Sequence, residues 1–202
     1  MDGQEYLNQI SASVRPEKKS KLSFLNSTIF KLIAGAVVAF ILIAIIGGIL
    51  SSGKTGVKDQ AIELKLNIDS TLEVISEFQP SIKSSDLRSS SASLYSVLSN
   101  TSRDLTTYVT ENYEYTPKND NKKFADDVAL ERDGLESALF EAKINGVLDQ
   151  VYANKLAYVI SLIYTKELNL NNATSKEDLQ AILDSSINSL STLYDKFDDF
   201  QK

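Results

Sequence analysis

The chain has 202 residues and a net charge of −6, and it contains neither cysteine nor histidine. Without these residues it has no disulfide framework, no thiolate chemistry, no Ser-His-Asp catalysis and none of the common zinc sites. An enzyme built on this sequence would have to rely on carboxylates, Lys, Tyr or Ser alone. The composition therefore favours a non-enzymatic protein with no catalytic, cofactor-binding or metal-binding residues.

Residues 32–50 are an unbroken apolar run of nineteen residues without a charged side chain. A helix of that length covers roughly 28 Å, which is close to the hydrocarbon thickness of a bilayer. The run also lacks the polar face that the surface helices of globular proteins keep. We therefore predict a flexible tail at 1–28, a single transmembrane helix at 29–50, a linker at 51–56 and a helical domain at 57–202.

The distribution of charge predicts the orientation of this span. Residues 1–31 carry five basic and three acidic groups, whereas the remainder carries sixteen basic and twenty-four acidic groups. The positive-inside rule then places the tail in the cytoplasm and the C-terminal domain outside the cell membrane. A domain with a net charge of −8 and no basic cluster is not expected to bind nucleic acid. Cleavage near Gly53 is the alternative, although the apolar core of a signal peptide is normally shorter.

Two spacings of small residues within the span, Gly35 with Ala39 and Ala44 with Gly48, permit close contact between helices in lipid. They are the candidate residues for self-association into a homo-oligomer, although such spacings also occur by chance.

Residues 48–55 match the phosphate-binding pattern G-x-x-x-x-G-K-[ST]. That motif works between a buried strand and a helix, with a downstream Asp that helps to hold magnesium. Here a predicted membrane helix precedes it, so we interpret the segment as a linker.

The domain after the linker has few turn-forming residues, namely Gly134, Gly146, Pro80 and Pro117 beyond residue 56. A β fold would need turns about every ten residues. Apolar residues instead recur three and four apart, which predicts an all-α antiparallel bundle of four to five helices. Asn145-Gly146 either ends the third helix or only bends it. The predicted apolar positions are Ala61, Leu64, Ile68, Thr71, Leu72, Ile75 and Phe78; Leu87, Leu94, Leu98, Leu105, Tyr108 and Val109; Phe124, Val128, Leu135, Ala138 and Ala142; Val147, Val151, Leu156, Val159, Leu162 and Ile163; and Leu179, Ile182, Ile187, Leu190, Leu193, Phe197 and Phe200.

Turn and cap signals separate these segments. Residues 115–121 are the clearest turn, and residues 171–174 are predicted to be a loop. Ser175 with Asp178 resembles a capping box at the start of the last helix, with Asp in place of the usual Glu.

Two groups of side chains are candidates for binding. Carboxylates in the third helix can hold a metal, but a solvated helix face is the more frequent explanation of such runs, and the same holds near the C-terminus. Tyrosines near the predicted turn can stack on a sugar or a partner, or simply pack. These residues are Asp126, Asp127, Glu131, Asp133, Glu136 and Glu141; Asp195, Asp198 and Asp199; and Tyr108, Tyr113 and Tyr115.

The opening residues 1–7, the basic patch at 15–21 and the isoleucine-rich span resemble uncharacterised single-pass envelope proteins of Saccharibacteria-type, small-genome bacteria. The resemblance covers about the first fifty residues and implies no activity. We expect a non-enzymatic envelope protein that binds lipid through its span and another envelope protein through its domain. A sensory domain that binds a ligand and signals through a partner is the alternative, and a carboxylate-dependent enzyme is the third hypothesis.

Overall fold

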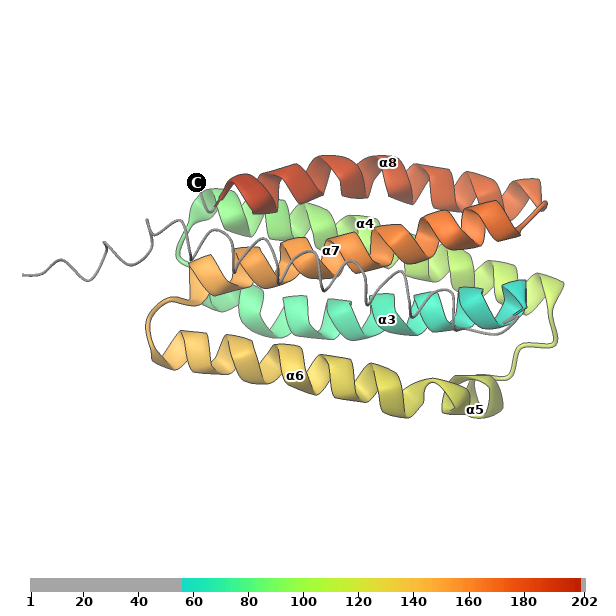
Figure 1. Cartoon of the computed structure of the whole chain (residues 1–202), viewed down its shortest axis with the longest axis horizontal. Coiled ribbons are helices and arrows are strands. Elements are labelled where there is room, and N and C mark those ends of the chain that lie inside the picture. Colours follow the sequence, from blue (N-terminus) through green and yellow to red (C-terminus); the bar gives the residue numbers. More distant parts are fainter. Residues whose placement is uncertain (1–55, 201–202) are drawn as a thin grey trace, which may run out of the picture. The chain divides into compact units, whose positions relative to one another are not determined.

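The computed structural model describes residues 56–200, and the regular structure of this part is entirely helical, which confirms the all-α prediction for it (Figure 1). The predicted tail, the predicted membrane helix and the part of the predicted linker before Gly56 lie outside the described residues. Among residues 56–200, no helix combines the length and the apolar composition that crossing a bilayer requires. The long helices are α3 (Val57–Phe78), α4 (Ser85–Asn112), α6 (Ala125–Ile144), α7 (Leu148–Ala173) and α8 (Glu177–Asp199), with the short α5 (Pro117–Asp120) before α6 and 3₁₀ turns at Gln79–Ser81 and Asn121–Lys123.

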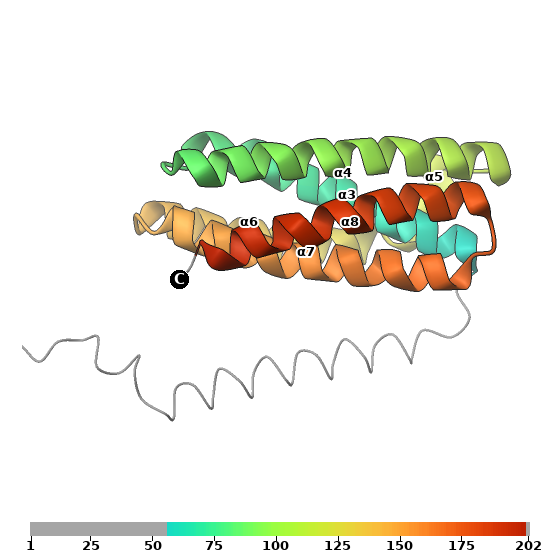
Figure 2. The same cartoon turned by 90° about the horizontal axis from the view of Figure 1, so that it is seen from above.

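Four of the long helices enclose one core. Helix α3 packs on α4, α4 on α8, α8 on α7, and α7 on α3, so these four helices form a closed ring. Helix α6 packs on the outside of this ring, against α3 and α7 (Figures 1 and 2). Because each long helix runs back along the one before it, α3, α6 and α8 point in one direction and α4 and α7 in the other.

The spacing of apolar residues determines which face of each helix enters the core. All six predicted positions of α4 are buried, and so are the predicted positions of α3 except Leu72, which is partly buried, so those two faces are confirmed. In α7 the prediction holds only in part. Leu156 and Ile163 are buried, but the other predicted positions are partly buried or exposed, and the core face includes Tyr152, Ile160 and Leu170 instead. In α8, Leu183 is fully buried, whereas Phe200 is 37% exposed at the end of the helix.

Asn145-Gly146 ends the third helix. Helix α6 stops at Ile144, and Gly146 has a φ of 72°, the left-handed conformation that favours glycine. The Val147 N–H bonds to the Ala142 carbonyl at 3.0 Å, and the Gly146 N–H bonds to the Lys143 carbonyl at 3.2 Å. These two bonds form a Schellman cap, which uses the last carbonyls of the helix. Val147 therefore leaves the predicted core face and is 46% exposed.

The predicted loop at 171–174 is wrong, because α7 continues to Ala173. The buried Leu170 holds the last turn in the core, and its carbonyl accepts the Thr174 N–H at 3.0 Å. Asn171 donates to Asp184 Oδ1 of α8 at 2.8 Å, so its side chain does not compete with the backbone of its own helix.

The predicted capping box is also wrong. Helix α8 begins at Glu177, its N-cap residue is Lys176, and no side chain caps it. The Thr174 Oγ1 instead accepts the Lys176 N–H at 3.1 Å, which stabilises the short connection before the helix.

Two phenylalanines of α8 test this packing. Phe197 is fully buried with its ring centroid 6.5 Å from that of Tyr152, whereas Phe200 is 37% exposed. We expect Phe197→Ala to lower the free energy of unfolding by about 3–5 kcal/mol, and Phe200→Ala to lower it by roughly 1 kcal/mol or less. Guanidinium unfolding of the detergent-solubilised chain, followed by circular dichroism, measures both. Equal losses would show that the end of α8 is packed differently.

Candidate functional site

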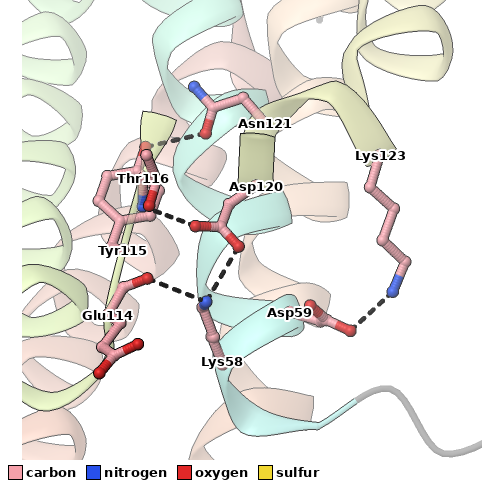
Figure 3. A network of polar contacts seen from close by, with 8 residues as sticks. All are labelled: Lys58, Asp59, Glu114, Tyr115, Thr116, Asp120, Asn121 and Lys123. Carbon is pink, nitrogen blue, oxygen red and sulfur yellow. Dashed lines mark hydrogen bonds and ion pairs between the residues drawn. The ribbon is translucent and has the colours of Figure 1, made fainter. Parts of the chain in front are cut away.

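Where the chain enters the domain, the first turn of α3 is tied to the connection between α4 and α6 (Figure 3). Lys58 Nζ lies 2.9 Å from Asp120 Oδ1 and donates to the Glu114 carbonyl oxygen at 3.5 Å. Lys123 Nζ lies 2.6 Å from Asp59 Oδ2. These contacts, called the entry network below, join the residues that follow the linker directly to the segment that leads into α6.

The same network holds the connection itself in shape. Asp120 Oδ2 accepts the Thr116 N–H at 2.6 Å, and the Tyr115 hydroxyl donates to Asn121 Oδ1 at 2.8 Å (Figure 3). The hydrogen bond from Thr116 and the neighbouring Lys58 lower the pKa of Asp120 below its ordinary value. Asp120 therefore stays ionised near neutral pH, which preserves both contacts.

A groove of about 310 Å³ lies between α3, α6 and α7. Its apolar lining includes Leu135, Val159 and Ile163. Three cations, Arg132, Lys155 and Lys166, also line it. The volume is at the lower end of the range that small-molecule sites occupy.

Two of these cations are already paired. Lys166 Nζ lies 2.7 Å from Glu63 Oε1, and Arg132 Nη1 lies 3.0 Å from Glu73 Oε2, so both tie a neighbouring helix to α3. Lys155 makes no ion pair with the described residues and is exposed. The groove thus offers one available cation beside an apolar lining.

The outward face of α6 is the second candidate site. Helix α6 fully buries only Leu139 and Ala142. On the opposite side, exposed residues follow one another four and three apart, which is the spacing of a single helix face. This face, called the outer seam below, consists of Asp126, Leu130, Asp133, Ser137, Phe140 and Ile144.

Large apolar side chains are unusually exposed on the outer seam. Leu130 is 74% exposed and also lines the groove. Phe140 is 57% and Ile144 71% exposed, and the exposed Val147 follows in the next turn of the chain. Phe140 and Ile144 are neighbours one helical turn apart. A single exposed apolar residue is ordinary, but a run of them on one face indicates an interaction surface.

Acidic residues border the outer seam. Asp127 and Glu141 lie along one flank, with Gly134 between them, and Glu136 lies on the other flank beside Lys143. Helix α6 has six acidic and two basic residues, for a net charge of −4. The apolar seam therefore lies in a strongly negative surface.

A buried acid joins α7 to α8. Glu167 is fully buried, and the Ser186 hydroxyl donates to its Oε1 at 2.7 Å. Its Oε2 is buried without a hydrogen-bond partner among the described residues. Burial raises the pKa of Glu167 to about 8, although the bond from Ser186 opposes the shift. The carboxyl is therefore mostly protonated at neutral pH.

The residues singled out in the sequence do not converge on one site. Gly35, Ala39, Ala44 and Gly48, and the phosphate-loop pattern at 48–55, lie outside the described residues. The carboxylates of α6 are spread along its exposed side, and residues 56–200 contain no group of three or more side chains placed to hold a metal ion. Asp195 and Asp199 are likewise exposed on α8.

The three candidate tyrosines pack within the domain. Tyr108 is buried, and its ring meets that of Tyr113 edge-on at a centroid distance of 6.0 Å. The Tyr115 hydroxyl is bonded to Asn121 in the entry network. Of the two predicted roles, packing within the domain is the one that the structure shows for these three side chains.

Sequence reasoning did not identify the outer seam, the groove or Glu167. A signal for Glu167 exists, because it lies four residues after Ile163 and three before Leu170, within the buried face of α7. The outer seam also has a signal, since Phe140 and Ile144 lie opposite Leu139 and Ala142 on the helix. The groove is formed by residues of three helices, so no local sequence pattern predicts it.

Comparison of the chain with protein-family models, with curated proteins and with solved structures gives no match.

The buried acid predicts a pH dependence. Because its folded-state pKa of about 8 exceeds the ordinary 4.5, the folded protein binds more protons than the unfolded chain between these values. The protonated group contributes its full stability below this window. As pH rises through the window, the free energy of unfolding falls by up to about 1.4 kcal/mol per pH unit. We expect Glu167→Gln to flatten the fall and to be more stable than the wild type at pH 8.

Unfolding free energies measured across that pH window provide the test. Asp195→Asn, an exposed carboxylate on α8, is the control and should leave the slope unchanged. Identical slopes for the wild type and Glu167→Gln would contradict a protonated buried acid.

Gly134 within α6 and Gly146 just after it make a matched pair for stability. An added Cβ at Gly134 meets nothing within 4 Å, and the residue lies inside α6. We expect Gly134→Ala to raise the free energy of unfolding by roughly 0.5–1 kcal/mol, because Ala is the better helix former. Gly146→Ala should lower it by about 1–2 kcal/mol, because φ is positive there. Denaturant unfolding distinguishes them, and a loss at Gly134 would reveal a contact on the outward face.

Proposed function

We propose that this chain is a single-pass, membrane-anchored protein of the cell envelope, with its tail in the cytoplasm and its helical domain outside. The apolar run at 32–50 and the excess of basic residues before it support this topology. The domain is non-enzymatic and binds another envelope protein through the outer seam of α6.

The exposure of the outer seam carries this proposal. Leu130, Phe140 and Ile144 leave most of their apolar surface in water, although the same helix buries Leu139 and Ala142 on its other side. Helix folding alone gives no reason to place a phenylalanine and an isoleucine on the solvent side of an amphipathic helix. A partner that covers the seam removes that apolar surface from water.

The rest of the domain makes the outer seam a rigid surface. Helix α6 is held by the Arg132–Glu73 ion pair to α3 and by packing on both α3 and α7. The entry network fixes the segment that leads into its first turn. A preorganised helix face lowers the entropic cost of binding.

The groove between α3, α6 and α7 favours a second candidate function, a sensory domain that binds a small ligand. Its apolar lining and the available Lys155 suit an anionic, largely apolar molecule. In that case a partner protein would carry the signal across the membrane.

The small residues Gly35, Ala39, Ala44 and Gly48 support a further proposal, that two copies associate through the span. This contact would lie in the membrane and is independent of the outer seam.

The partner proposal is tested by site-specific photo-crosslinking of the full chain in its native membranes. We expect a photoreactive residue at Ser137 to give a defined adduct, and the same residue at Thr107, exposed on α4, to give none. Phe140→Ser with Ile144→Ser should abolish the adduct while the domain stays folded.

The absence of a seam-dependent adduct at Ser137 would overturn the partner-binding proposal. Saturable binding of a small molecule that depends on Lys155 would then favour the sensory function instead.

A further inference from the structure

We propose that the outer seam of α6 receives a basic amphipathic helix of the partner protein. This inference rests on the proposed function and specifies the partner's chemistry. It follows from the spacing of the seam, from the charges that flank it and from the open space at its centre.

The spacing of the seam suits a helix. Its exposed positions alternate four and three apart over five turns of α6, which is the pattern by which one helix faces another in a coiled coil. Phe140 and Ile144 supply the apolar anchors toward the C-terminal end, and Leu130 supplies one toward the N-terminal end. An extended peptide would contact only part of such a line, whereas a helix laid along it can contact every anchor.

The centre of the seam is open to close approach. Ser137 lies between the anchors, Gly134 lies beside it, and an added Cβ at Gly134 would have empty space around it. No large side chain of α6 therefore stands between Leu130 and Phe140 on this face. A partner helix can approach the backbone of α6 there while its own apolar residues pack at either end.

The flanks of the seam determine the charge of that helix. On one side Glu136 already pairs with Arg132, 3.6 Å from its Nε, whereas on the other side Asp127 and Glu141 occupy the positions that face the partner's flank in a helix pair. Their carboxylates favour Lys or Arg at the corresponding positions of the partner, and they disfavour acidic ones.

The same charges disfavour a second copy of this chain as the occupant. Two α6 helices, each with a net charge of −4, would bring acidic flanks together. The residues after position 31 also carry a net charge of −8, which adds long-range repulsion between copies.

The experiment uses the full chain in nanodiscs of neutral phosphatidylcholine and two fluorescent probe peptides. Both probes are synthetic amphipathic helices of about three heptads with Leu at the a and d positions, one with Lys and one with Glu at the flanking positions. We expect the Lys probe to bind the wild-type chain, and the Glu probe to bind at least tenfold more weakly, as measured by fluorescence anisotropy.

Two test variants, each with a matched control, distinguish binding at the seam from background binding to lipid or to any acidic surface. Phe140→Ser with Ile144→Ser should raise the Kd of the Lys probe at least tenfold, whereas Tyr95→Ser, 41% exposed on α4, should leave it unchanged. Asp127→Lys with Glu141→Lys should transfer the preference to the Glu probe. Glu111→Lys with Asp195→Lys changes the net charge equally on α4 and α8 and should not transfer it.

Equal binding of both probes, or an equal effect of the two charge-reversal pairs, would overturn the basic-helix inference. Self-association of the chain that depends on Phe140 and Ile144 would also overturn it, with a second copy as the occupant. The Ser137 adduct distinguishes the two proposals. If it forms while the probes show no charge preference, the partner surface stands and only the basic helix is excluded.

Discussion

The closed packing of α3, α4, α7 and α8 around one core is the constraint on which the rest of the domain depends. Once each of these four helices has a neighbour on both sides, no inner position remains for a fifth. Helix α6 must then pack from outside, across α3 and α7, and can bury only a narrow strip. Its opposite face is left to solvent, so the architecture itself creates a long helix face available to another molecule.

Both ends of this arrangement are held by a few polar contacts. At one end, Lys58 and Asp59 of the first turn of α3 contact the segment before α6. At the other end, the Asp149 carboxylate of α7 accepts the N–H groups of Lys83 and Ser84, at 3.0 and 2.8 Å. These turns are therefore fixed to helices that are distant in sequence.

The sequence predicts most of the helices because their apolar residues recur three and four positions apart, which is the helical period. In α3 the predicted apolar positions are buried except for Leu72, which is partly buried, because packing there agrees with the local pattern. The predicted loop at 171–174 fails because Asn171 finds a partner on α8, a contact that no local pattern contains. The outer seam is harder to predict, because periodicity assigns apolar residues to a core and does not identify the face that lacks one.

Three features of the domain depart from what stability alone favours: the apolar outer seam, Gly134 within a helix, and the buried Glu167. Natural sequences depart from such rules most often where function requires it. The seam and Gly134, which borders both the seam and the groove, belong to the same helix, and the proposed binding of a partner helix to α6 would account for both.

Glu167 lies instead between α7 and α8, in the ring that supports α6, and the seam does not explain it. A hydrophobic side chain in its place would lose only the bond to Ser186, so its presence makes the α7–α8 contact sensitive to protonation. Helix α7 belongs both to this contact and to the surface on which α6 packs. The stability of the ring on which α6 packs therefore depends on the protonation of Glu167.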